Sequence, residues 1–97
     1  MTDQGNGITG EITGKLELLP NPCTTKPCLP ALAFAVVAED RVPHFLTRDG
    51  KFVLHNAAGL PSPGETVVVV GDVHEQQDVN GKTFKTIQFT TITAATH

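Results

Sequence analysis

Tryptophan and tyrosine are absent from this 97-residue chain, which has one methionine and two cysteines. The five phenylalanines are therefore the only large aromatic side chains that can fill a core or stack on a ligand. The longest apolar stretch, residues 29–38, is about half the length needed to cross a bilayer, even if Pro30 is ignored. We therefore expect no membrane span.

Sequence signatures of catalytic sites are also missing. The chain has no G-x-S-x-G, P-loop or dinucleotide fingerprint, and its ten acidic residues fall in predicted turns or on polar strand faces. The net charge is −3, and the seven lysines and arginines are scattered singly along the sequence, so no field would attract a phosphate backbone. We predict a protein that is not an enzyme, uses no cofactor and does not favour nucleic acid.

Helical periodicity is absent, and alternation with a period of two takes its place. No window of eleven residues keeps apolar positions at helical spacing without a glycine or proline. In residues 8–18 the even positions are Ile, Gly or Leu, and the odd positions are Thr, Glu or Lys. This pattern predicts a half-buried strand whose inward glycines, Gly10 and Gly14, permit tight coiling or a close backbone approach.

Other segments extend the all-β reading. Residues 31–38 are apolar throughout, which indicates a strand covered on both faces, and residues 56–64 form a loop rich in Gly, Ala and Pro. Pro43 marks its strand as an edge strand protected against pairing with another chain, which favours a monomer. The predicted strands after the first are residues 31–38, 42–47 with 52–55, 66–75 and 83–93.

The turn at residues 78–82 contains Asn80-Gly81, a pair that often forms a two-residue hairpin loop. A three-residue loop matches the side chains better, because it places Val73 opposite Ile87. We therefore predict a three-residue loop with a G1 bulge and a left-handed Gly81. A change of parity in the last strand predicts a second bulge near Thr90.

The turn at residues 47–51 contains Asp49-Gly50. The same argument predicts a three-residue loop here too, with Leu46 opposite Phe52 and Phe45 opposite Val53.

The C-terminal half combines residues 64–73, which read GETVVVVGDV, the DVNGK turn at 78–82, and the apolar residues Ile87, Phe89 and Ile92. This combination resembles the final two strands of small bacterial OB-fold domains. The resemblance implies a five-stranded, OB-like Greek-key barrel with little or no helix. We expect one such domain over residues 7–95, preceded by a disordered tail at residues 1–6.

Cys23 and Cys28 lie in a proline-rich loop, residues 20–30. Four intervening residues allow a small disulfide loop, which we favour, and a disulfide would favour an extracytoplasmic location. Free thiols, metal binding and redox chemistry remain alternatives, although the spacing is not the C-x-x-C of redox motifs. The sequence gives no other indication of the cellular location, because the first residues do not resemble a signal peptide.

Metal binding would need further ligands, because two cysteines do not complete a zinc site. The alternative ligand set is Cys23 and Cys28 with His44 and His55. No pair of histidines has a metal-binding spacing. The simpler interpretation is that His44 and His55 are ordinary strand residues that bind no metal.

A non-enzymatic binding or accessory domain is the leading hypothesis for function, with a protein or a small ligand as its partner. In OB folds the loop after the first strand and the last hairpin frame the binding face. Here they correspond to the loop 20–30 and the hairpin 76–85. The alternatives are a weak binder of single-stranded nucleic acid or oligosaccharide, and a metal-handling protein. Most phenylalanines are assigned to the core. The candidate ligand contacts are Lys26, Lys82, Phe84 and Lys85.

Overall fold

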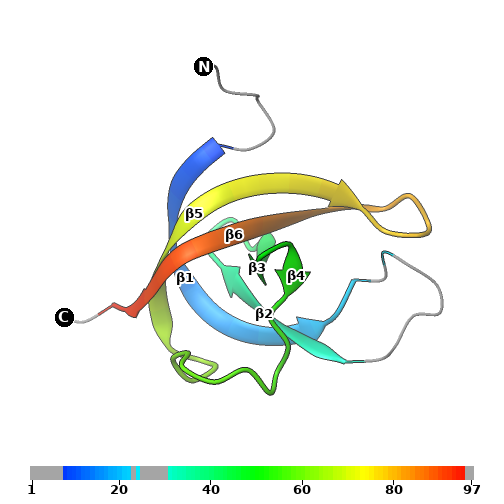
Figure 1. Ribbon diagram of the computed structural model, residues 1–97. Coiled ribbons are helices and arrows are strands. Elements are labelled where there is room, and N and C mark those ends of the chain that lie inside the picture. Colours follow the sequence, from blue (N-terminus) through cyan, green and yellow to red (C-terminus); the bar gives the residue numbers. More distant parts are fainter. Residues whose placement is uncertain (1–7, 23, 25–30, 96–97) are drawn as a thin grey trace.

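The computed structural model of the chain describes residues 8–22, 24 and 31–95, and every regular element in them is a strand (Figure 1). This confirms the all-β class. The predicted tail, residues 1–6, lies outside the described residues. The strands are β1 (Ile8–Pro20), β2 (Leu32–Val37), β3 (Pro43–Arg48), β4 (Lys51–Phe52), β5 (Thr66–Gln77) and β6 (Thr83–Ala94).

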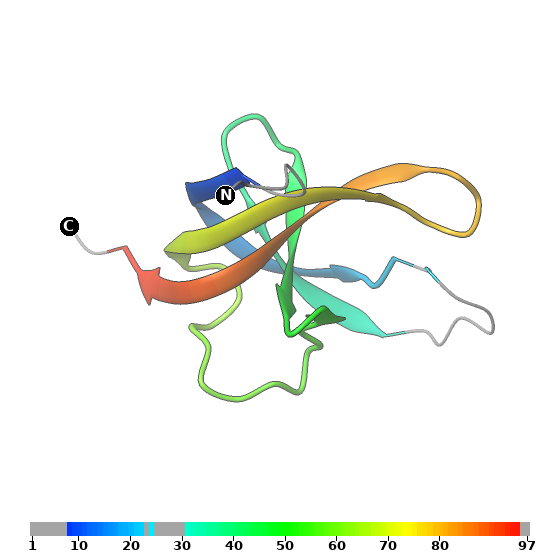
Figure 2. The same cartoon turned by 45° about the horizontal axis from the view of Figure 1, so that its top comes forward.

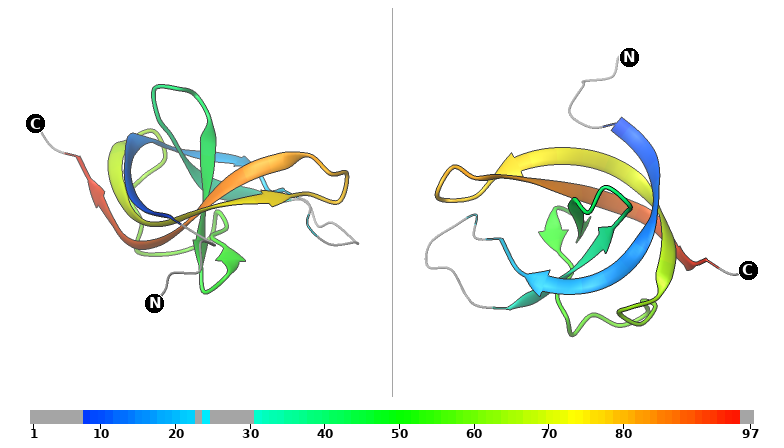
Figure 3. Two further views of the ribbon diagram at one scale, coloured as in Figure 1. Left: turned by 90° about the horizontal axis from the view of Figure 1, so that it is seen from above. Right: turned by 180° about the vertical axis from the view of Figure 1, so that it is seen from behind.

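The strands form one sheet that closes on itself. Their order is β2-β1-β5-β6-β3-β4, and an additional pairing of β2 with β3 completes the ring (Figure 3). The long β1 pairs with β5 through its first half and with β2 through its second half, while β3 and β6 run parallel. The five longer strands thus make the expected OB-like barrel, and the two-residue β4 is an addition at its edge.

The barrel closes tightly at two glycines that face neighbouring backbone. A Cβ atom on Gly14 would lie 2.7 Å from the carbonyl carbon of Val37, where the end of β2 passes over β1. A Cβ atom on Gly71 of β5 would lie 2.6 Å from the Cα of Phe89 on β6. Real Cβ atoms do not approach other atoms this closely, so both positions require glycine. The predicted close approach at Gly14 is confirmed.

The hairpin between β5 and β6 has the predicted register. Val73 pairs with Ile87, the amide of Asp78 donates to the carbonyl of Lys82, and Gly81 has a φ of 83°. The three-residue loop and the left-handed Gly81 are therefore confirmed. The hairpin extends beyond the ring of strands (Figure 2).

The second predicted bulge is also present. The β5–β6 register shifts between Val70 and Gly71, which leaves Thr90 without a Cα partner. The Thr90 hydroxyl donates to the carbonyl of Val70 at 3.1 Å. The shift keeps Phe89 and Ile92 packed against the core although their sequence parity differs.

The prediction for the first turn is wrong. Phe52 pairs with Thr47, and Lys51 pairs with Arg48, so the loop has two residues. Asp49 and Gly50 have φ values of 56° and 79°, as a type I′ turn requires, and the twist of that turn suits a tight hairpin. This register turns Phe52 to the side of the sheet opposite to the barrel interior.

The prediction of an edge position for the strand at residues 42–47 is also wrong. In the structure β3 pairs with β2, β4 and β6. Pro43 is tolerated because it is the first residue of β3, where a missing N–H interrupts no central ladder. The argument for a monomer that rested on this edge therefore no longer applies.

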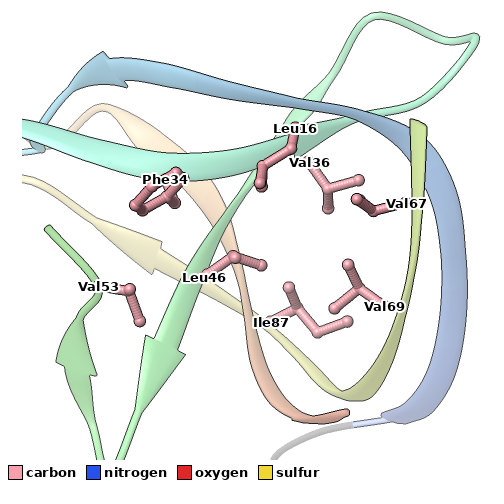
Figure 4. Close-up of a cluster of buried hydrophobic side chains, with 8 residues drawn as sticks. All are labelled: Leu16, Phe34, Val36, Leu46, Val53, Val67, Val69 and Ile87. Atoms are coloured by element: carbon pink, nitrogen blue, oxygen red, sulfur yellow. The ribbon is translucent and has the colours of Figure 1, made fainter. Parts of the chain in front are cut away.

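The main core fills the barrel with aliphatic side chains and one aromatic ring from all five long strands (Figure 4). The irregular segment 53–65 covers this core, since Ala57 and Leu60 pack against it. A loop was predicted for most of this segment. The buried residues of this cluster are Leu16, Phe34, Val36, Leu46, Val53, Val67, Val69 and Ile87.

A second, smaller cluster lies on the outer face of the same sheet. Alternation along β2 sends Phe34 and Val36 into the barrel, and sends Ala33 and Ala35 out to this cluster. Both alanines are fully buried, which confirms that this strand is covered on both faces. The residues packed around them are Leu19, Phe45, Phe52, Leu54 and Phe84.

Candidate ligand-binding site

A concave site lies beside the second cluster, with which it shares Phe45 and Phe84. The β5–β6 hairpin, which supplies part of its lining, projects at one end of the barrel (Figure 1). The volume of the site is about 420 Å³, which lies within the range of small-molecule sites in proteins. We call it the hairpin hollow. It is lined by Pro22, Val42, Pro43, Phe45, Asp78, Lys82, Thr83, Phe84 and Lys85.

Parallel pairing of β3 and β6 positions most of this lining. The described pairing begins with His44 opposite Lys85, so the residues just before it in each strand, Pro43 and Phe84, lie at the same end of the sheet. Pro22, two residues beyond the end of β1, contributes the third side. Three segments distant in sequence therefore converge on one hollow.

The apolar side of the hairpin hollow is supported by three mutually packed phenylalanine rings. The centroid of Phe45 lies 6.1 Å from that of Phe84 and 6.3 Å from that of Phe52, both edge to face. Phe52 and Phe84 are 6.0 Å apart and tilted by 41°. Phe45 is only 7% exposed and Phe84 is half-buried, so Phe84 presents more of its ring to a ligand.

The assignment of most phenylalanines to the core is only partly confirmed. Phe34 lies in the main core, and Phe89 packs against it. Phe45 and Phe52 instead join Phe84 on the outer face. Sequence parity missed the shared role of Phe45 and Phe52 because the wrong turn register placed the two rings on opposite faces, whereas the observed pairing of Phe52 with Thr47 puts both on the outer face.

Two lysines and one aspartate supply the charges of the hairpin hollow. Lys82 and Lys85 are exposed residues of the hairpin. Asp78 is turned toward its own turn, because its Oδ1 accepts from the amide of Asn80 at 2.8 Å and from that of Lys82 at 2.9 Å. The lining thus carries a formal charge of +1, from two lysines and one aspartate, on a chain whose net charge is −3.

His44 flanks the hairpin hollow without lining it. Its Nδ1 lies 3.2 Å from the carbonyl oxygen of Val42, and its imidazole is half-buried. Burial lowers the pKa of His44, with a smaller lowering from Lys85, while the Val42 carbonyl and Asp40 act in the opposite direction. We therefore expect a neutral imidazole at pH 7, which adds no charge to the site.

The structure brings together three of the four predicted ligand contacts. Lys82, Phe84 and Lys85 all line the hairpin hollow. Lys26, the fourth, lies outside the described residues, as do Cys23 and Cys28 with their predicted disulfide. Within the described residues, no three His, Cys, Asp or Glu side chains are grouped so that they could hold a metal ion. His44 lies on β3, and the exposed His55 follows β4.

A second, shallower hollow of about 300 Å³ borders β4. Its lining includes Arg48, Lys51 and Phe52, none of which was predicted from the sequence as a ligand contact. The Arg48 guanidinium lies 5.1 Å from the centroid of the Phe89 ring, within the range of a cation–π contact. The Asp49-Gly50 pair is the sequence signal for the tight turn that brings Arg48 and Lys51 together.

No protein-family model matches the sequence, and no curated protein is significantly similar to it. In the part of the chain that the structure describes, no helix is long and apolar enough to cross a membrane.

Proposed function

We propose that this chain is a non-enzymatic binding domain whose ligand occupies the hairpin hollow. The observation that carries the proposal is the concave apolar lining formed by three segments distant in sequence, with the half-buried Phe84 at its side. A half-buried aromatic ring in a hollow gains contacts and loses water when a ligand covers it. The hairpin 76–85 and the first residues of the loop 20–30 supply the frame of this site.

The rigidity of the surroundings also supports a binding role. Phe45 and Phe52 hold Phe84 through edge-to-face and tilted ring contacts. Asp78 holds the turn of the hairpin through two backbone amides. A ligand would therefore meet a largely preformed surface, which reduces the entropic cost of binding.

Amide NMR spectra of isotope-labelled protein test the proposal with a panel of small aromatic fragments as probes. We expect fragment-induced shifts in the amides of Phe45, Thr83, Phe84 and Lys85, because these residues line the hairpin hollow. Shifts confined to other faces of the barrel, or no shifts from any fragment, would contradict the proposal.

A pair of variants locates the response. In Phe84→Ala we expect the apparent affinity of the fragments, measured from the amide shifts, to fall at least tenfold. The loss of a well-packed aromatic contact costs at least the corresponding free energy. Leu32→Ala is the matched control, because Leu32 is 44% exposed and does not line the hairpin hollow. Both variants must retain a dispersed spectrum of a folded domain.

Single-stranded nucleic acid is a second candidate ligand, favoured by one specific observation. Of the six lysines and arginines in the described residues, four line one of the two hollows. They are Arg48, Lys51, Lys82 and Lys85. Phosphates could contact these side chains, and bases could stack on Phe52 or Phe84.

Binding of a fluorescent single-stranded DNA distinguishes this candidate. It predicts binding that weakens with salt, and that weakens further in Lys82→Ala with Lys85→Ala. Absence of binding at low salt would eliminate nucleic acid and leave the fragment result unaffected.

A further inference from the structure

We infer that the hairpin hollow selects an amphipathic anion, a small molecule that joins one apolar group to one acidic group. This inference rests on the proposed function and names the class of its ligand. It follows from the way the lining divides into an apolar part and a cationic part.

The apolar part comes from the barrel side of the hollow. Pro22, Val42, Pro43 and Phe45 bring no charged group, and Phe84 faces them from the first residues of β6. Val42 is also one of the exposed large hydrophobic residues of the domain, at 37% exposure. An apolar group of the ligand would cover these side chains and remove them from water, which favours binding in proportion to the area covered.

The cationic part comes from the hairpin alone. Lys82 and Lys85 both line the hollow and lie on either side of Phe84 in the sequence, near the first residues of β6. Their aliphatic stems can lie along the apolar lining while the ammonium groups remain at its rim. An acidic group there would accept charge-assisted hydrogen bonds, which are stronger than those between neutral groups.

Asp78 does not cancel this preference. One carboxylate oxygen accepts from the amides of Asn80 and Lys82, so the group is oriented toward the turn. The remaining lining charge is +1, and it sits beside apolar side chains, where an ion pair is less screened than in open solvent. A cationic ligand would be repelled by the two lysines that line the hollow.

Three ligands with one common apolar group test the inference: phenylbutanoate, phenylbutanol and phenylbutylamine. We expect the acid to bind about tenfold more tightly than the alcohol, because it adds charge-assisted hydrogen bonds, and the amine to bind most weakly. Affinities come from amide shift titrations, with the shifts located on Phe45, Thr83, Phe84 and Lys85.

A double variant assigns the preference to the two lysines. Lys82→Met with Lys85→Met keeps the unbranched stems, and we expect it to bind the acid and the alcohol equally. Lys15→Met is the control, because Lys15 is exposed and lines neither of the two hollows. The control should retain the tenfold preference for the acid.

The outcomes separate the two proposals. Equal binding of all three ligands in the hairpin hollow, or tighter binding of the amine, would overturn the selection of anions and leave the proposed site intact. An acid preference that survives the Lys82→Met, Lys85→Met change would overturn the assignment to these lysines. If none of the three ligands shifts these amides while the broader fragment panel does, the ligand class is wrong. If neither does, the proposed function is wrong as well.

Discussion

Replacing Gly71 with alanine is expected to destabilise the barrel by about 3 kcal/mol or more, the upper end of the cost of overpacking. The added Cβ would lie 2.6 Å from the Cα of Phe89 and 2.8 Å from the carbonyl carbon of Gln88. These are backbone atoms of β6, so no side chain can rotate to make room. The two strands would have to separate beside the bulge at Thr90.

Urea unfolding, followed by circular dichroism, measures this loss. Gly59→Ala is the matched control, because Gly59 has a φ of 84° but no atom within 4 Å of the added Cβ. It carries only the conformational cost of a left-handed alanine, about 1–2 kcal/mol. A loss in Gly71→Ala no larger than in Gly59→Ala would contradict the close approach of β5 and β6.

Leu46→Ala is expected to lower the free energy of unfolding by about 3 kcal/mol, within the range for buried leucines. Leu46 is fully buried, and its β3 position pairs with Ile87 of β6, in the parallel contact that helps to close the ring. The substitution removes apolar contacts and leaves a cavity that the surrounding strands cannot fill by collapsing.

The same unfolding measurement on Leu32→Ala provides the control. Leu32 is 44% exposed, so its truncation should cost less than about 1 kcal/mol. Comparable losses in Leu46→Ala and Leu32→Ala would mean that the barrel interior does not contain Leu46 in the packed position described.

The two hairpins show how far side-chain pattern alone can set a register. At residues 73–87 the strands have one apolar and one polar face, so a shift by one residue would place Ile87 among polar groups. At residues 46–52 both faces are apolar, since Leu46 enters the main core and Phe52 enters the outer cluster. Pattern cannot distinguish two registers there, and the backbone preference of Asp49-Gly50 decides.

The sequence predicted the part of the candidate site that the hairpin supplies, but it did not predict the part that comes from β3. Lys82, Phe84 and Lys85 are close in sequence, so turn chemistry alone brought them together. Phe45 and Val42 reach the hairpin hollow only because β3 runs parallel to β6, a contact between distant segments that no local pattern encodes. For the same reason, lysines and arginines scattered along the sequence line the two hollows in the folded chain.

Intermolecular nuclear Overhauser effects between bound phenylbutanoate and the protein test most directly whether the hairpin hollow is a binding site. We predict contacts from the phenyl protons to the rings of Phe45 and Phe84, and from the methylene group next to the carboxylate to the side chain of Lys82 or Lys85. Contacts instead to Val68 and Val70, half-buried residues of β5 that do not line the hairpin hollow, would contradict the proposed site.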